Sequence, residues 1–174
     1  ITNAAILYRI VQMIDNETWV AMSSDVKGEI YEGLLQRNAE DQKSGAGQYF
    51  TPRPVINAMV RCVAPEPMKT IADPCCGSGG FFLASQSYIS DPSNYTLDRE
   101  QKEFLKDKTF YGNEIVGATF KTALMNLYLH NIGDIYTEAP VTLGDALLLD
   151  PGYRVDYVLT NPPFGKKSSL TFTN

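Results

Sequence analysis

Apolar residues recur with the spacing of an α-helix over the first forty residues of the chain. The first run consists of Ile6, Leu7, Ile10, Val11 and Ile14, and the second of Val26, Ile30, Tyr31, Leu34 and Leu35. The helix-start signal Ser23-Ser24-Asp25 precedes the second run. We therefore predict an N-terminal helical segment over residues 1–46, the C-terminal part of a helical domain, which ends in a polar, glycine-containing loop at Gln42–Gln48.

A different pattern begins at Thr51, where Thr51-Pro52-Arg53-Pro54 is typical of a helix start. The expected apolar face of this helix consists of Val55, Ile56, Met59, Val60 and Val63. After Pro67, short apolar runs alternate with helical patterns, which predicts strand–helix–strand units and a mostly parallel sheet. The predicted strands are Thr70–Ala72, Thr109–Tyr111, Val141–Leu143 and Val155–Thr160. The predicted helices are Gly79–Ile89, a short charged helix within residues 91–108, and Thr119–Asn131, with Phe120, Leu124, Leu127 and Tyr128 on one face.

This order of elements indicates an α/β fold with a Rossmann-like, doubly wound sheet. Such sheets usually have about five or more strands, whereas the pattern stops shortly after the fourth. We therefore expect an incomplete sheet and a chain that is part of a longer protein.

Composition narrows the function classes. The chain of 174 residues is 44% apolar and 20% charged, which is typical of a globular protein. It has neither a membrane-spanning run nor a signal peptide, so we expect a cytoplasmic protein. Three cysteines and one histidine suit neither a disulfide framework nor a metal site. The net charge of −5 is unfavourable for binding DNA phosphates, so a DNA substrate would have to be held by a partner.

The most specific local feature is Asp73-Pro74-Cys75-Cys76-Gly77-Ser78-Gly79-Gly80-Phe81, at a predicted strand-to-helix junction. Glycines allow a ligand to approach the backbone N–H groups there, and the helix N-terminus adds a favourable dipole. The spacing differs from that of the G-x-G-x-x-G dinucleotide motif, and Asp73 suits a ligand with a positive group. An ordinary glycine-rich turn capped by Asp73 explains the same residues.

Acidic residues follow the next two predicted strands. Glu114 ends Tyr111-Gly112-Asn113-Glu114-Ile115, where α/β folds commonly bind ribose hydroxyls, and Asp145 follows Gly144. A solvated strand-end charge at Glu114 and an ordinary turn at Asp145 are the alternatives.

Asn161-Pro162-Pro163-Phe164 follows the last predicted strand. The prolines lack N–H groups, which leaves carbonyls and the Asn161 side-chain oxygen as acceptors. With the aromatic face of Phe164, they would suit an amino group on a flat ring. A rigid loop with an asparagine turn is the alternative.

In this order, and with Gly47–Val55 upstream, these motifs closely resemble those of the S-adenosylmethionine-dependent N6-adenine DNA methyltransferases. The upstream block and the helical lead look most like the modification (M) subunit of type I restriction–modification systems. The resemblance spans residues 25–168 and rests on five weak motifs in the correct order. It implies that residues 47–174 are the N-terminal half of the methyltransferase catalytic domain.

The resemblance also implies a role for each motif residue. In the cofactor site, the methionine end would lie against Tyr49, Phe50 and Thr51. Asp73 would face the amino group of the cofactor, with Gly77 and Gly79 beneath it. Glu114 would hold the ribose hydroxyls, and Asp145 would accept from the adenine amino group of the cofactor. Asn161, which would also border the cofactor, and the Pro162 carbonyl would accept from the target adenine N6, beside Pro163 and with Phe164 stacked on the flipped base. Cys75 stands where the family usually has alanine. No covalent intermediate is implied, so neither Cys75 nor Cys76 is expected to be a nucleophile.

The implied partners are double-stranded DNA and the specificity and restriction subunits of a hetero-oligomer. Two alternatives stay open. A methyltransferase could act on another planar amino group, namely cytosine N4, RNA adenine or protein glutamine, and a non-catalytic assembly subunit could retain the same fold.

Overall fold

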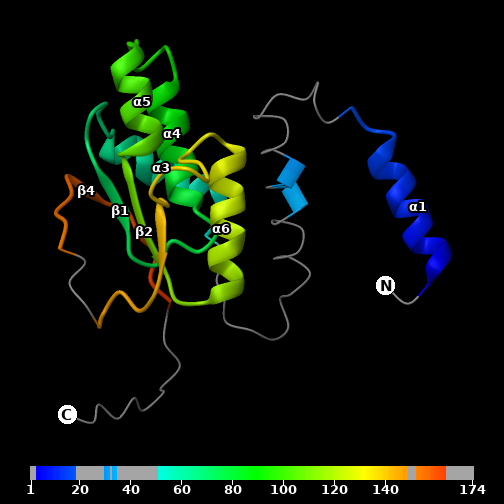
Figure 1. The fold of residues 1–174 in the computed structure, drawn as a ribbon. Helices are drawn as coiled ribbons and strands as arrows, with labels where there is room; N and C mark the ends of the chain where they lie inside the picture. The colour runs from blue at the N-terminus through cyan, green and yellow to red at the C-terminus, as the bar shows by residue number, and fades with distance from the viewer. Residues whose placement is uncertain (1–2, 19–29, 32, 35–50, 149–151, 164–174) are drawn as a thin grey trace, which may run out of the picture.

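The computed structural model describes residues 3–18, 30–31, 33–34, 51–148 and 152–163 (Figure 1). The helices are α1 (Ala4–Asp15), α3 (Arg53–Val63), α4 (Gly80–Ser90), α5 (Arg99–Asp107) and α6 (Gly117–Leu129). The strands are β1 (Ile71–Asp73), β2 (Phe110–Glu114), β3 (Val141–Leu143) and β4 (Tyr157–Val158). In these parts of the chain, no helix combines the length and apolar character needed to cross a bilayer.

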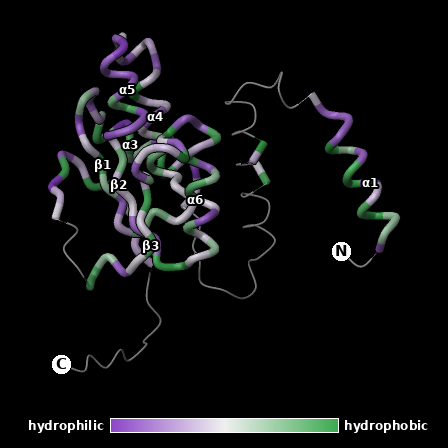
Figure 2. Tube along the Cα trace, viewed as in Figure 1, coloured by the Kyte–Doolittle hydropathy of each residue, from purple (hydrophilic) through white to green (hydrophobic). Residues whose placement is uncertain are grey.

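The first predicted helix is confirmed as α1, which begins where the Asn3 side chain accepts hydrogen bonds from the N–H groups of Ala5 and Ile6. All of its residues are exposed, and Figure 2 shows apolar and polar positions alternating along it. Ile30, Tyr31, Gly33 and Leu34 are helical, as predicted. The rest of the second apolar run and the loop at Gln42–Gln48 lie outside the described residues.

The four strands form one parallel sheet in the order β3-β2-β1-β4. Ile71 pairs with Phe110 of β2 and with Tyr157 of β4, so β1 has a strand on each side. The chain runs outward from β1 to β2 and β3, then returns to the other side of β1 with β4. This reversal of strand order confirms the predicted Rossmann-like fold class. In such folds, ligands bind at the point of reversal, which here lies between β1 and β4.

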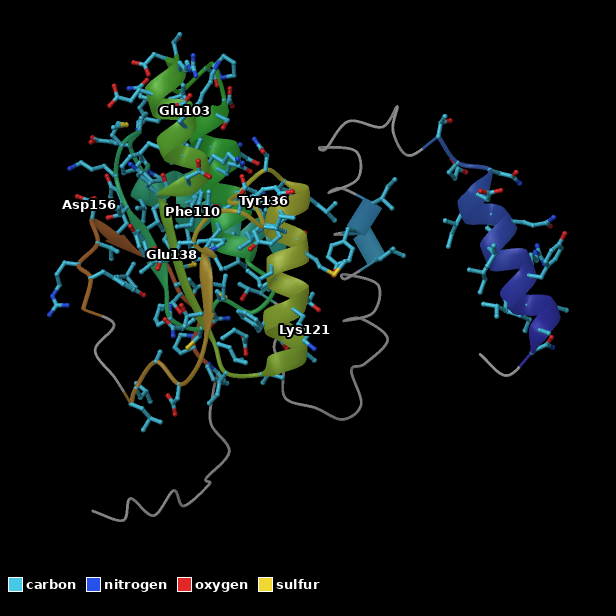
Figure 3. The ribbon with its side chains drawn as sticks, viewed as in Figure 1. Glu103, Phe110, Lys121, Tyr136, Glu138 and Asp156 are labelled. Carbon is cyan, nitrogen blue, oxygen red and sulfur yellow. The ribbon has the colours of Figure 1, made fainter. Side chains whose placement is uncertain are left out.

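Helix α4 packs on the face of the sheet that carries Ile71 and Phe110 (Figure 1). The rings of Phe82 and Phe110 lie 5.1 Å apart, and Figure 3 shows Phe110 in the interior, between strand and helices. A Cβ at Gly112 would lie 2.9 Å from the Phe82 ring, so only glycine permits this close approach. The core on this face consists of Ile56, Val60, Ile71, Cys76, Phe81, Phe82, Leu83, Ala84, Ile89, Leu105, Phe110, Ala123, Leu127, Ile132, Val141 and Leu159.

Two predictions about element faces and lengths are corrected. Only Ile56 and Val60 of the expected face of α3 are buried, because the helix contacts the core along a narrow stripe. The predicted strand Val155–Thr160 pairs with β1 only at Tyr157 and Val158. The Asp156 side chain takes the place of a ladder bond there, because its Oδ2 accepts the Thr70 N–H at 2.8 Å.

Asp156 fixes the start of β4 against the start of β1. Its Oδ2 also accepts from the Thr70 hydroxyl at 2.9 Å, and its Oδ1 from Lys69 Nζ at 3.2 Å. These hydrogen bonds lower the pKa of the Asp156 carboxyl. Figure 3 shows Asp156 next to β4, on the outer edge of the sheet. The strand that leads to Asn161 is therefore held by side chains as well as by its short ladder.

Candidate functional site

The predicted strand-end residues gather at one edge of the sheet, because parallel strands end on the same side. Asp73 ends β1 and Glu114 ends β2, and both are buried. Asp145 follows β3 by two residues and Asn161 follows β4 by three. The strand-end positions predicted from sequence are thus brought together at the edge where ligands bind in sheets of this type.

Asp73 is the most strongly perturbed acid of this edge. Its side chain is 2% exposed, and its Oδ1 accepts the Cys75 N–H at 3.0 Å. Burial raises the pKa of Asp73 to about 6, although the Cys75 N–H acts in the opposite direction. A charged Asp73 is therefore costly in the ligand-free protein, and a cationic group in the site would offset that cost.

The glycine-rich loop after β1 turns directly beneath this edge. Gly77 and Gly79 have positive φ angles of 56° and 85°, a conformation that glycine adopts without strain. Gly79 is also the N-cap of α4, and a Cβ there would lie 2.9 Å from Leu127 of α6. Asp73 caps the start of this turn through the Cys75 N–H, as in the alternative explanation, whereas the N-cap of α4 itself is Gly79.

Glu114 is joined to the same loop through both carboxylate oxygens. Oε2 accepts the Gly77 N–H at 3.1 Å, and Oε1 accepts the Val116 N–H at 2.8 Å. Each carboxylate oxygen has a second lone pair, so Glu114 can still accept hydroxyl groups of a ligand. The alternative of a solvated charge is wrong, because Glu114 is only 8% exposed.

Asp145 is half-buried, and its Oδ1 accepts the Leu147 N–H at 2.9 Å. The turn that carries it is tied to β2, because the Gly144 N–H donates to the Glu114 carbonyl at 3.1 Å. Asp145 therefore has the ordinary turn geometry of the alternative reading, at a position that also borders the site.

The site edge also contains a contact between two motifs that are far apart in sequence. The Asn161 side-chain Nδ2 donates to the Thr51 hydroxyl oxygen at 2.9 Å, across a separation of 110 residues. Both side chains are half-buried. Pro162 and Pro163 continue from Asn161 and are exposed. The predicted residues Tyr49, Phe50 and Phe164 lie outside the described residues.

Two supports of the glycine loop were missed from the sequence. Asn126 of α6 is 1% exposed, and its Nδ2 donates to the Ser78 carbonyl at 2.9 Å. Arg53 of α3 donates from Nη1 to the Gly80 carbonyl at 3.0 Å. The sequence signal for Asn126 was a polar residue between the apolar positions Leu124 and Leu127 of α6. Arg53 lies in the Thr51–Pro54 helix start, and nothing in that pattern indicates a contact with Gly80.

The cysteines of the loop are poor nucleophiles. Burial raises the pKa of the Cys76 and Cys75 thiols, and nearby Asp73 and Glu114 act in the same direction. Cys76 is buried, whereas Cys75 is partly exposed. Across the part of the chain that the structure describes, no group of three His, Cys, Asp or Glu side chains is arranged to hold a metal ion.

A parallel sheet whose strand order reverses at β1, with buried carboxylates in the last residues of β1 and β2, defines an α/β fold of the class that commonly binds nucleosides. The comparison with known families makes this class specific. The chain belongs to the N-6 DNA Methylase family, whose model matches residues 22–174. The resemblance inferred from the sequence is thereby confirmed.

Individual relatives agree with this assignment. The chain is 38% identical to the type I restriction enzyme StySPI methylase subunit of Salmonella potsdam, over 99% of this chain and 34% of that protein. It is 36% identical to the EcoKI methylase subunit of Escherichia coli strain K12, over 99% of this chain and 34% of that protein. The crystal structure of the EcoKI M protein matches with a TM-score of 0.60 and 33% identity, over 75% of this chain and 28% of that chain. The chain thus spans about a third of the length of these curated relatives.

Proposed function

We propose that this chain carries the cofactor pocket and the target-base acceptors of a DNA methyltransferase. The enzyme would transfer a methyl group from S-adenosylmethionine to adenine N6 in double-stranded DNA, as the modification subunit of a type I restriction–modification system. The observation that carries the proposal is the gathering of Asp73, Glu114, Asp145 and Asn161 at one edge of the sheet, in a member of this family. The proposal keeps the boundary between a helical segment at residues 1–46 and a catalytic region at 47–174.

The chemistry of the buried acceptors suits this cofactor. The raised pKa of Asp73 indicates a carboxylate that lacks full compensation for its burial, as expected of a group that receives an ammonium ion. Glu114 is fixed by two backbone N–H groups in a position to accept ribose hydroxyls. In the proposal, Asp145 accepts from the adenine amino group of the cofactor, while Tyr49, Phe50 and Thr51 border its methionine end.

The chain's contribution to methyl transfer is to bind and orient the target amine. The lone pair of an exocyclic amine on adenine is delocalised into the ring, which makes the amine a weak nucleophile. Acceptors at Asn161 Oδ1 and the Pro162 carbonyl would draw its two hydrogens out of the ring plane and localise the lone pair. The bound cofactor would supply a positively charged sulfonium that activates the methyl group. Phe164 would stack on the flipped base, beside Pro163.

The proposal includes partners, because the charge of this chain does not favour DNA. A specificity subunit would hold the duplex, and a restriction subunit would complete the hetero-oligomer. Two homologues named above are methylase subunits of type I enzymes, which supports this assignment. With DNA as its substrate, the protein would be cytoplasmic.

The test is the substitution Asn161→Ala in the complete protein, assembled with its specificity subunit. We expect methyl transfer to adenine to fall about a hundredfold to a thousandfold, because a preorganised polar group at the reacting centre is lost. Cofactor affinity should change little, since Asp73 and Glu114 remain. The measurements are single-turnover transfer of a radiolabelled methyl group and calorimetric titration of the cofactor.

Asn57→Ala, at an exposed asparagine of α3, is the matched control and should transfer at the normal rate. Normal transfer by Asn161→Ala would refute the assignment of the acceptor. Cofactor binding without transfer to any nucleic acid by the unmodified protein would favour the non-catalytic assembly subunit. Transfer to cytosine, RNA or a glutamine peptide in place of DNA adenine would favour the other substrates.

A further inference from the structure

The contact between Thr51 and Asn161 joins two rigid parts of the fold. Thr51 immediately precedes Pro52, the N-cap of α3, and α3 is anchored by the buried Ile56 and by the bond from Arg53 to the Gly80 carbonyl. On the other side, the Leu159 N–H donates to the Ala72 carbonyl of β1 at 3.0 Å, two residues before Asn161. The 2.9 Å hydrogen bond therefore links two fixed elements.

The direction of this hydrogen bond sets which end of the amide is left for a substrate. An asparagine side chain has donors on Nδ2 and acceptors on Oδ1, and rotation about its last bond exchanges the two. Because Nδ2 donates to Thr51, Oδ1 is the end that remains to accept a hydrogen bond. The opposite orientation would present N–H groups to an amine that itself offers hydrogens, and the two would repel.

The Thr51 hydroxyl is suited to hold this orientation. A hydroxyl has one proton and two acceptor lone pairs. Thr51 can therefore accept from Asn161 while its proton is donated to another acceptor. In the proposed function that acceptor is the cofactor carboxylate, and the oxygen is then an acceptor only, which leaves Nδ2 as the compatible end of Asn161.

We propose that Thr51 is a positioning residue for Asn161, and that its hydroxyl sets the amide so that Oδ1 faces the target amine. This inference rests on the proposed function and adds to it the residue that determines the state of the acceptor. Thr51 affects methyl transfer by orienting Asn161. This effect is separate from any contact between Thr51 and the cofactor.

The experiment compares Thr51→Val, Thr51→Ala and Thr51→Ser in the complete protein with its specificity subunit. Valine keeps the shape and removes the hydroxyl, alanine removes both, and serine keeps the hydroxyl. At saturating cofactor and DNA, we expect Thr51→Val and Thr51→Ala to transfer about tenfold to a hundredfold more slowly, because the reacting groups are misoriented. Thr51→Ser should restore most of the rate. Thr122→Val is the matched control, because it removes a hydroxyl that donates a hydrogen bond to the Ala118 carbonyl within α6. This variant should transfer methyl groups at the normal rate.

A double-mutant cycle separates positioning from stability. If Thr51 acts through Asn161, the transfer rate of the double variant Thr51→Val/Asn161→Ala should be within about threefold of that of Asn161→Ala alone. Once the Asn161 amide has been removed, the Thr51 hydroxyl has no side chain to orient, so its loss adds little. Thermal melting of each variant reports folding, and calorimetry reports the cofactor contact independently of the transfer rate.

Three results would overturn the inference: a normal transfer rate in Thr51→Val, multiplicative losses in the double mutant, or a loss in Thr51→Ser equal to that in Thr51→Val. In each of these cases Asn161→Ala would still be slow, and the proposed function would stand. Normal transfer by Asn161→Ala is the distinct result that would overturn the proposed function and this inference together.

Discussion

At the scale of single residues, the position of Asp73 in the fold disfavours the charged form of its side chain. Its carboxylate is buried at the end of β1, and this burial raises its pKa to about 6 from an ordinary value of 3.8. The folded protein therefore binds a proton more tightly than the unfolded chain does. Stability is greatest below pH 3.8 as far as Asp73 is concerned, and it falls as the pH rises through 6.

Asp73→Asn should for this reason stabilise the protein at neutral pH while it weakens the cofactor site. We expect the free energy of unfolding at pH 7.5 to rise by about 1–3 kcal/mol, since a one-unit pKa shift corresponds to about 1.4 kcal/mol. The gain should shrink towards zero near pH 4. Denaturant unfolding between pH 4 and 8 measures this. A variant less stable than the native chain at pH 7.5 would show that the buried Asp73 carboxylate does not destabilise the fold.

At the scale of elements, helices from both sides support the glycine-rich loop. Helix α3 contacts it through Arg53, and α6 through Asn126 and Leu127. The loop itself has few side chains, so its conformation depends on these neighbours. This dependence accounts for the burial of a polar side chain, that of Asn126, near the C-terminal end of α6.

Asn126→Ala should therefore lower stability and loosen the loop. The half-buried Ser78 carbonyl would lose its partner, which costs about 1–3 kcal/mol of unfolding free energy. Met125→Ala, at the adjacent but exposed position of α6, is the control and should change stability by about 0.5 kcal/mol or less. Denaturant unfolding compares the two, and cofactor titration reports the loop. Equal effects from the two variants would contradict this role.

At the scale of the whole molecule, the described fold could be predicted from the sequence as far as local patterns determine it. The strands, the main helices and the strand-end acids follow from periodicity and turn residues. The Thr51–Asn161 contact could not be predicted, because it depends on how α3 and β4 dock around β1. The sequence also predicted too long a strand at β4, because the Thr70 N–H is bonded by the side chain of Asp156 and not by a backbone carbonyl of β4.

The same scale determines how the chain meets DNA. With a net charge of −5, it lacks the excess of Lys and Arg that produces phosphate binding. We expect no sequence-specific DNA binding by this chain without a partner subunit, and specific binding once the specificity subunit is added. Gel shifts at several salt concentrations measure this. Specific, salt-resistant binding by the chain alone would contradict the expectation.

The 110-residue separation between Thr51 and Asn161 also has a consequence for folding during synthesis on the ribosome. The strand-end residues come together only when β4 has been synthesised and pairs with β1, long after Thr51 and Asp73. Contacts of such high sequence separation form late, because the entropy of closing the loop must first be overcome. A ligand that needs all of these residues stabilises only the finished fold. In the proposed function, cofactor binding would therefore stabilise the chain only after synthesis has passed Asn161.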